Sequence, residues 1–167
     1  MITLTRDPML TAARIFILFA MGVTALGGGI LLLAAPIMVI GRYVLLVHAS
    51  AFLAFAGLVL IAAAMAALFF LLLRHLLHIV ETVGQGDPFV PANATRLTSM
   101  AWLSLLIEAA RLPAGAIIFW LSEVSNEKIE INFDISFGGV LLSAILFVLS
   151  RVFRKGAEMR ADLEGMI

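Results

Sequence analysis

Long apolar runs alternate with short polar segments along this chain. The runs cover residues 15–40, 49–73, 97–121 and 135–153, and they consist mainly of Ala, Leu, Ile, Val and Phe. A helix needs about 20 residues to cross the hydrocarbon core of a bilayer. Only a structure that satisfies its own backbone hydrogen bonds is stable there, and the alternating pattern of a barrel strand is absent. The pattern therefore predicts four transmembrane helices.

Composition supports the same class. The chain has 167 residues, of which 63% are hydrophobic and 13% charged, and its mean hydropathy is +1.13. A soluble domain is closer to half apolar and a quarter charged. We therefore expect a single transmembrane domain over residues 1–167, with an all-α fold built as an integral membrane four-helix bundle.

Basic residues in the polar segments predict the orientation, because Lys and Arg concentrate in short cytoplasmic loops. With four spans, both termini lie on the same side as the middle loop, residues 74–96. That side carries eight Lys or Arg residues and the other side two, Arg42 and Lys128. Both termini, the loop and a helical tail at residues 154–167 are therefore predicted to be cytoplasmic. The eight are Arg6, Arg14, Arg74, Arg96, Arg151, Arg154, Lys155 and Arg160.

The segment GQGDPFVPAN, residues 84–93, interrupts the apolar pattern in the middle of the chain. Its two prolines prevent one helix from running straight through. Asn93 is predicted to cap the next helix, accepting from a free backbone amide with its side chain. Phe89 is unnecessary in a plain linker. We expect it to anchor the loop on the start of the tail, near Phe153 and Gly156.

Two charged residues, Glu108 and Arg111, fall inside the third apolar run. They are three positions apart and therefore share one helix face. Charges at that depth are costly and usually face the helix bundle or water. They form either a mutually neutralising structural pair or a proton or ligand site, and Pro113 is predicted to kink the helix beside them.

Catalytic and metal chemistry have little support. His75 and His78 have a spacing that can bind a metal, but no cysteine and no nearby third ligand accompanies them. Asp87 and Glu81 form no set of nucleophile, base and orienting group with them. We therefore predict no enzymatic activity, no metal and no cofactor, and the zero net charge implies no direct binding of nucleic acid.

Small residues at helical spacing mark helix contacts in lipid. The pairs Ala25 with Gly29 and Gly139 with Ser143 are candidates, as is the stripe that runs from Ser50 to Ala66. We expect these positions to pack the four helices against one another.

The C-terminal tail has an apolar stripe at steps of three and four, which is typical of one face of a helix. Charged residues occupy the other side, where Arg154 with Glu158 and Arg160 with Glu164 are possible ion pairs. Such a stripe predicts a partner: a second copy of the chain, the headgroup layer or a cytosolic protein. The stripe consists of Val152, Gly156, Met159, Leu163, Met166 and Ile167.

Two patches carry a resemblance to a known family. "GDPFVPANATRL" and "VFRKGAEMR" resemble a bacterial family of small four-span membrane proteins, domain of unknown function 2975. The final residues depart from that pattern, because Met166 stands where a Thr is common. The resemblance implies no settled activity, but it implies a gene paired with a small helix-turn-helix regulator. The matching positions are Gly86, Pro88, Phe89, Asn93, Leu97, Phe153, Arg154, Gly156, Ala157 and Arg160.

These observations give two hypotheses of function. The first is a membrane regulator or docking protein that holds a small helix-turn-helix transcription factor. The alternative is a small-solute or proton transporter, or a sensor, that uses Glu108 and Arg111. The candidate partner-binding residues are Pro88, Phe89, Asn93, Phe153, Arg154, Gly156, Arg160 and Leu163.

Overall fold

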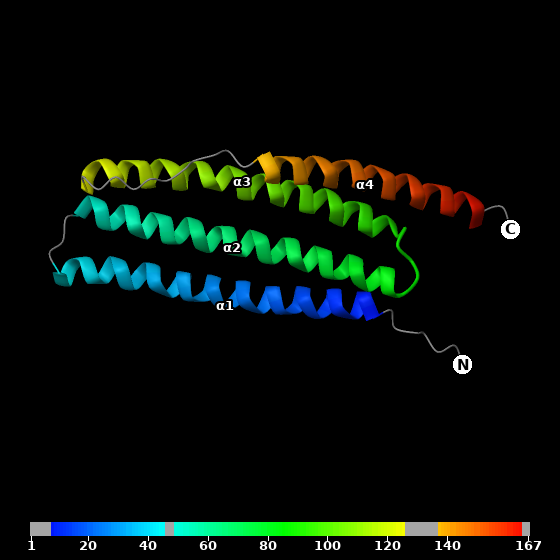
Figure 1. The fold of residues 1–167 in the computed structure, drawn as a ribbon, viewed down its shortest axis with the longest axis horizontal. Coiled ribbons are helices and arrows are strands. Elements are labelled where there is room, and N and C mark those ends of the chain that lie inside the picture. Colours follow the sequence, from blue (N-terminus) through cyan, green and yellow to red (C-terminus); the bar gives the residue numbers. More distant parts are fainter. Residues whose placement is uncertain (1–7, 46–48, 126–136, 165–167) are drawn as a thin grey trace.

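Four long helices make up the protein. The structure, a computed structural model, describes residues 8–45, 49–125 and 137–164. Within these residues there is no strand, and every helix is long and apolar enough to cross a membrane. The prediction of an all-α protein with four membrane-spanning helices is confirmed. The helices are α1 (Pro8–Leu45), α2 (Ala49–Gly84), α3 (Pro91–Ser125) and α4 (Phe137–Glu164) (Figure 1).

The helices lie in a row rather than in a closed bundle. Among the described residues, the backbone of α1 lies close to that of α2, α2 to α3, and α3 to α4, whereas the backbones of α1 and α3, α1 and α4, and α2 and α4 do not approach one another closely. The bundle expected from the sequence is therefore open. In addition, α4 covers only the half of α3 that follows the α2–α3 loop, because Gly139 at its start lies against Glu108 (Figure 1).

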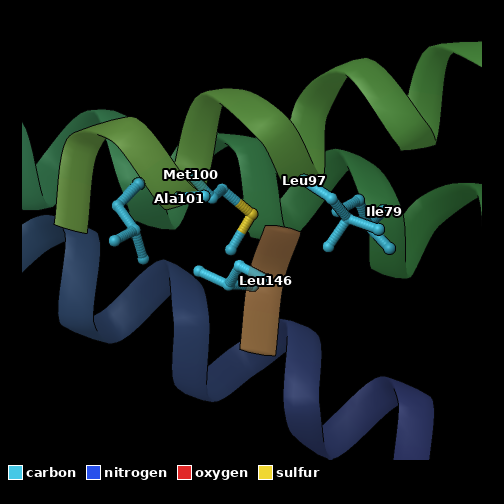
Figure 2. Close-up of a cluster of buried hydrophobic side chains, with 6 residues drawn as sticks. Ile79, Leu97, Met100, Ala101 and Leu146 are labelled. Carbon is cyan, nitrogen blue, oxygen red and sulfur yellow. The ribbon is translucent and has the colours of Figure 1, made fainter. Parts of the chain in front are cut away.

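A small hydrophobic core lies near that loop. It joins side chains of α2, α3 and α4 (Figure 2). Elsewhere large apolar side chains such as Phe19 and Leu33 are exposed on the helix surfaces, which is the distribution expected where lipid is the solvent. The core residues are Leu72, Ile79, Leu97, Met100, Ala101 and Leu146.

Helices α1 and α2 approach closely at Gly28. A Cβ atom at this position would lie 3.2 Å from the Cβ of Ala66, so the missing side chain permits the contact. Ala66 belongs to the small-residue stripe predicted for α2. The pair predicted for α1 is wrong, however, because Ala25 is exposed and a Cβ at Gly29 would meet nothing within 4 Å.

We expect Gly28→Leu to destabilise the protein by about 1–3 kcal/mol, because the added side chain would force α1 away from α2. Gly27→Leu is the matched control, since a Cβ at Gly27 meets nothing within 4 Å. Thermal unfolding in detergent, followed by circular dichroism, measures both variants. Equal unfolding temperatures for the two would contradict the contact.

Candidate functional site

Two backbone hydrogen bonds end α2 where the α2–α3 loop begins. The amide of Gly86 donates to the carbonyl of Val83 at 3.0 Å, and the amide of Asp87 donates to that of Thr82 at 3.1 Å. These two bonds form a Schellman motif, which needs a left-handed residue. Gly86 supplies it with φ of 82°. The chain therefore leaves α2 in a fixed direction.

Asn93 then ties the loop to both helices. Its side-chain amide donates to the hydroxyl of Thr82 at 2.7 Å and to the carbonyl of Pro88 at 2.9 Å, and its oxygen accepts from Arg96 at 2.8 Å. The residue is fully buried. It connects the end of α2, the loop and the first turns of α3 in one hydrogen-bonded network.

The prediction that Asn93 caps α3 is wrong. The helix begins at Pro91, two residues earlier. Proline is favoured at the first helical position, where its missing N–H would have no intrahelical partner. Asn93 thus lies inside the first turn, and its amide donates to the carbonyl of Val90 at 2.9 Å.

Phe89 joins the loop to α4. Its ring centroid lies 5.4 Å from that of Phe153, with the planes tilted by 46°. A Cβ at Gly156 would lie 2.6 Å from the Phe89 ring, so glycine at this position makes room for the ring. The prediction that Phe89 packs on the tail near Phe153 and Gly156 is confirmed.

An ion pair closes the same contact. Arg160 of α4 binds the carboxylate of Asp87 in the loop. We call the set Asp87, Phe89, Phe153, Gly156 and Arg160 the loop–tail joint. Asp87 was not among the expected binding residues, although its place in the loop beside a basic tail offered that signal. The joint holds the C-terminal part of α4 against the loop.

The structure divides the expected partner-binding residues into two groups. Asn93 is buried, and Phe153 and Gly156 are partly buried in the joint, so they support the surface from beneath. Leu163 and Arg154 are exposed. These two lie nine positions apart, on opposite faces of α4, because each helical residue turns by about 100°. They therefore cannot contact one compact ligand.

The other polar residues of the tail also differ in part from expectation. Glu158 pairs with Lys155 at 3.3 Å, rather than with Arg154. The expected pairing of Arg160 with Glu164 is untested, whereas Arg160 does pair with Asp87. The stripe predicted for the tail remains exposed at Val152, Met159 and Leu163, whereas Gly156 lies beneath Phe89. Met166 and Ile167 lie outside the described residues.

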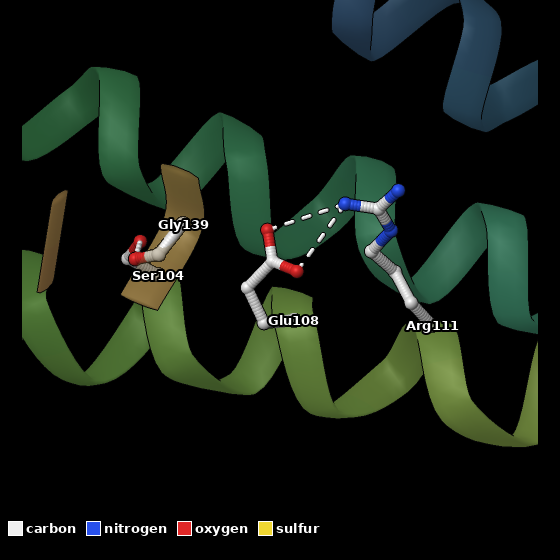
Figure 3. A network of polar contacts seen from close by, with 4 residues as sticks. All are labelled: Ser104, Glu108, Arg111 and Gly139. Atoms are coloured by element: carbon white, nitrogen blue, oxygen red, sulfur yellow. Dashed lines mark hydrogen bonds and ion pairs between the residues drawn. The ribbon is translucent and has the colours of Figure 1, made fainter. Parts of the chain in front are cut away.

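Glu108 and Arg111 lie together on α3, and Gly139 near the start of α4 lies beside Glu108 (Figure 3). A guanidinium nitrogen of Arg111 lies 3.2 Å from a carboxylate oxygen of Glu108. Gly139 lies so close that an added Cβ would overlap the carboxylate of Glu108, and the carbonyl of Gly139 accepts from the Ser104 hydroxyl at 3.1 Å. The carboxylate is thus enclosed by α3 and α4 and neutralised within its own helix.

Gly139 and Ser143 behave as the predicted small-residue pair. Both lie on the side of α4 that packs against α3, and Ser143 is 3% exposed. His78 forms a hydrogen bond through Nδ1 with the carbonyl of Arg74 at 2.7 Å. Over residues 8–45, 49–125 and 137–164, no three His, Cys, Asp or Glu residues are grouped to hold a metal.

The fold and the joint define a multi-pass membrane protein whose central loop is tied to its last helix. The chain belongs to the family described as "Protein of unknown function (DUF2975)", whose model matches residues 50–167. The match covers the loop and both patches that carry the resemblance. Comparison with curated proteins and with solved structures gives no match.

Proposed function

We propose that this chain is a non-enzymatic docking protein of the bacterial inner membrane, which holds a small helix-turn-helix transcription factor at the cytoplasmic face. The class of partner comes from the family resemblance. The orientation comes from the excess of Lys and Arg on the side of the loop and the tail. On that side, the joint presents a surface already assembled before a partner binds.

The observation that carries the proposal is the docking face, which we define as the exposed part of Phe89 with Val152, Met159 and Leu163. The last three lie along one face of α4 and are 54–61% exposed. Phe89 is 41% exposed and covers Gly156 on the adjoining surface. Amphipathic helices of partner proteins bind such apolar surfaces through anchors at helical spacing.

The joint reduces the cost of binding. Ordering a loose loop and tail would consume part of the interaction energy. Here the ring contact of Phe89 with Phe153 and the ion pair of Arg160 with Asp87 hold both segments in place. A partner therefore meets a surface formed by two distant parts of the chain that are already in contact.

We expect Leu163→Glu to weaken partner binding by about tenfold or more, because a charge would replace an exposed apolar anchor. Ala161→Glu is the matched control: it adds the same charge two positions away, on the opposite side of α4. The full chain in nanodiscs is titrated with each purified small helix-turn-helix protein of the same genome. The affinity is measured by biolayer interferometry.

Three outcomes would contradict the proposal: no helix-turn-helix protein binds, both variants bind equally, or Ala161→Glu has the larger effect. Deletion of residues 154–167 should abolish binding. It also removes Arg160 and the joint, so the point variants give the sharper result.

Transport through Glu108 and Arg111 has weaker support. The carboxylate contacts Arg111 and is enclosed by Gly139, which favours a structural pair over a site that exchanges a ligand. A flux assay in proteoliposomes, with Glu108→Gln as the control, tests this alternative.

A further inference from the structure

A pocket lies between α3 and α4. Its volume is about 470 Å³. Thr98 lines the pocket from α3, and the other lining residues belong to α4, between Phe147 and Arg154. The lining residues are Thr98, Phe147, Val148, Ser150, Arg151 and Arg154.

Two guanidinium groups give the pocket its charge. Arg151 and Arg154 are three positions apart and both are exposed. In the part of the chain that the structure describes, neither arginine forms an ion pair. Glu158 pairs with Lys155 instead, and Asp87 pairs with Arg160. An arginine side chain presents several N–H donors in a planar fork that matches a phosphate group. The pocket thus has unneutralised positive charge suited to a phosphate.

Apart from these two arginines and the hydroxyls of Thr98 and Ser150, the lining of the pocket is apolar. Phe147 packs edge-on against Trp102, with ring centroids 5.5 Å apart and planes at 85°. Val148, which lines the pocket, is 65% exposed, and Trp102, which packs on Phe147, is 59% exposed. Tryptophan is enriched where a membrane protein crosses the boundary between acyl chains and headgroups. Phosphate donors and an apolar surface therefore adjoin one another, which suits an amphiphile better than a soluble phosphate.

The two hydroxyl groups that line the pocket do not donate into it. The hydroxyl of Thr98 donates to the Ala94 carbonyl at 3.0 Å, and that of Ser150 donates to the Phe147 carbonyl at 2.8 Å. Both are occupied as donors within their own helices. The donors to a phosphate must therefore come from Arg151 and Arg154.

We propose that this pocket binds an anionic phospholipid, with the phosphate at Arg151 and Arg154 and the acyl chains along Phe147, Val148 and Trp102. The lipid seals the groove between α3 and α4. Because Arg154 lies on the face of α4 opposite to Leu163, the phosphate site and the Leu163 anchor of the docking face are on different sides of the helix. Arg154 thus serves the membrane rather than the cytosolic partner.

Quenching of Trp102 by brominated lipid tests the proposal. The chain has two tryptophans, so Trp120→Phe leaves Trp102 as the reporter. The protein is placed in phosphatidylcholine nanodiscs that contain a minority of either brominated phosphatidylglycerol or brominated phosphatidylcholine. We expect stronger quenching by the brominated phosphatidylglycerol.

The variants isolate the two arginines. Each Lys or Arg near an anionic surface contributes roughly 1 kcal/mol. Arg151→Gln or Arg154→Gln should therefore lower the relative affinity for phosphatidylglycerol about fivefold, and the double variant about thirtyfold. Arg74→Gln removes one positive charge at an exposed position outside the pocket, so it is the charge-matched control for each single variant and should keep the preference. Circular dichroism verifies that each variant remains folded.

Three results would overturn the proposal. One is equal quenching by the two lipids in the protein with both arginines, a comparison that requires no arginine variant. Another is a preference that survives loss of both arginines or disappears equally in the charge-matched control. The third is displacement of the lipid by inorganic phosphate at matched concentration, which would assign the pocket to a soluble phosphate compound.

Discussion

Asn93→Ala is expected to lower the free energy of unfolding by about 2–4 kcal/mol. The substitution removes three hydrogen bonds at a fully buried position. The carbonyl of Pro88 loses its donor and the guanidinium of Arg96 loses an acceptor. Each buried polar group left without a partner costs about 1–3 kcal/mol. Thermal and denaturant-induced unfolding in detergent, followed by circular dichroism, measures the change.

Two further variants sharpen this test. Thr95→Ala, an exposed position in the same turn, should change stability by less than about 0.5 kcal/mol. Asn93→Asp keeps the shape but cannot donate to Thr82 or Pro88, so it should destabilise about as strongly as alanine. A stable Asn93→Asp variant would mean that a charge-assisted bond of the carboxylate with Arg96 outweighs the loss of the two donated bonds.

Gly139→Ala is expected to destabilise the protein by about 1–3 kcal/mol. The new methyl group would overlap the carboxylate of Glu108 and its Cγ atom, each closer than 2.5 Å to the position of the added Cβ. Either Glu108 must leave Arg111 or α4 must move away from α3. Unfolding in detergent measures the loss.

A double-mutant cycle identifies the cause. Glu108→Ala shortens the side chain that meets the methyl group. The double variant Glu108→Ala with Gly139→Ala should therefore be no less stable than Glu108→Ala alone. Additive losses would show that Gly139 acts through something other than its contact with Glu108.

The helices and the loop contact followed from strong local signals. Four apolar runs bounded by prolines, glycines and charges predict four spans, because the bilayer requires that length. Phe89 was predictable because an aromatic residue between two prolines at a membrane surface needs an apolar contact. The prediction that Asn93 caps α3 was wrong because both Pro91 and Asn93 are typical of a helix start, and the helix begins at Pro91.

The order of the helices was not predictable. Helices in lipid are apolar on most faces, so the sequence lacks the contrast between inner and outer faces that locates neighbours in a soluble protein. For the same reason, the sequence did not distinguish Gly28, which contacts α2, from its neighbour Gly29, which does not. The pocket at Arg151 forms only because α4 packs at a particular position along α3, and the sequence of one helix does not determine that position.

The row of helices has a consequence for how the protein is built. Helix α1 contacts only α2 among the described residues, and the family model begins at residue 50, within α2. The loop–tail joint, the Glu108 pair and the lipid pocket all lie on α2, α3, α4 and the connecting loop. Because the described contacts of α1 are with α2 at one edge of the row, including the ion pair of Arg14 with Glu81, we expect the unit of α2, α3 and α4 to keep these sites when α1 is exchanged for another apolar helix.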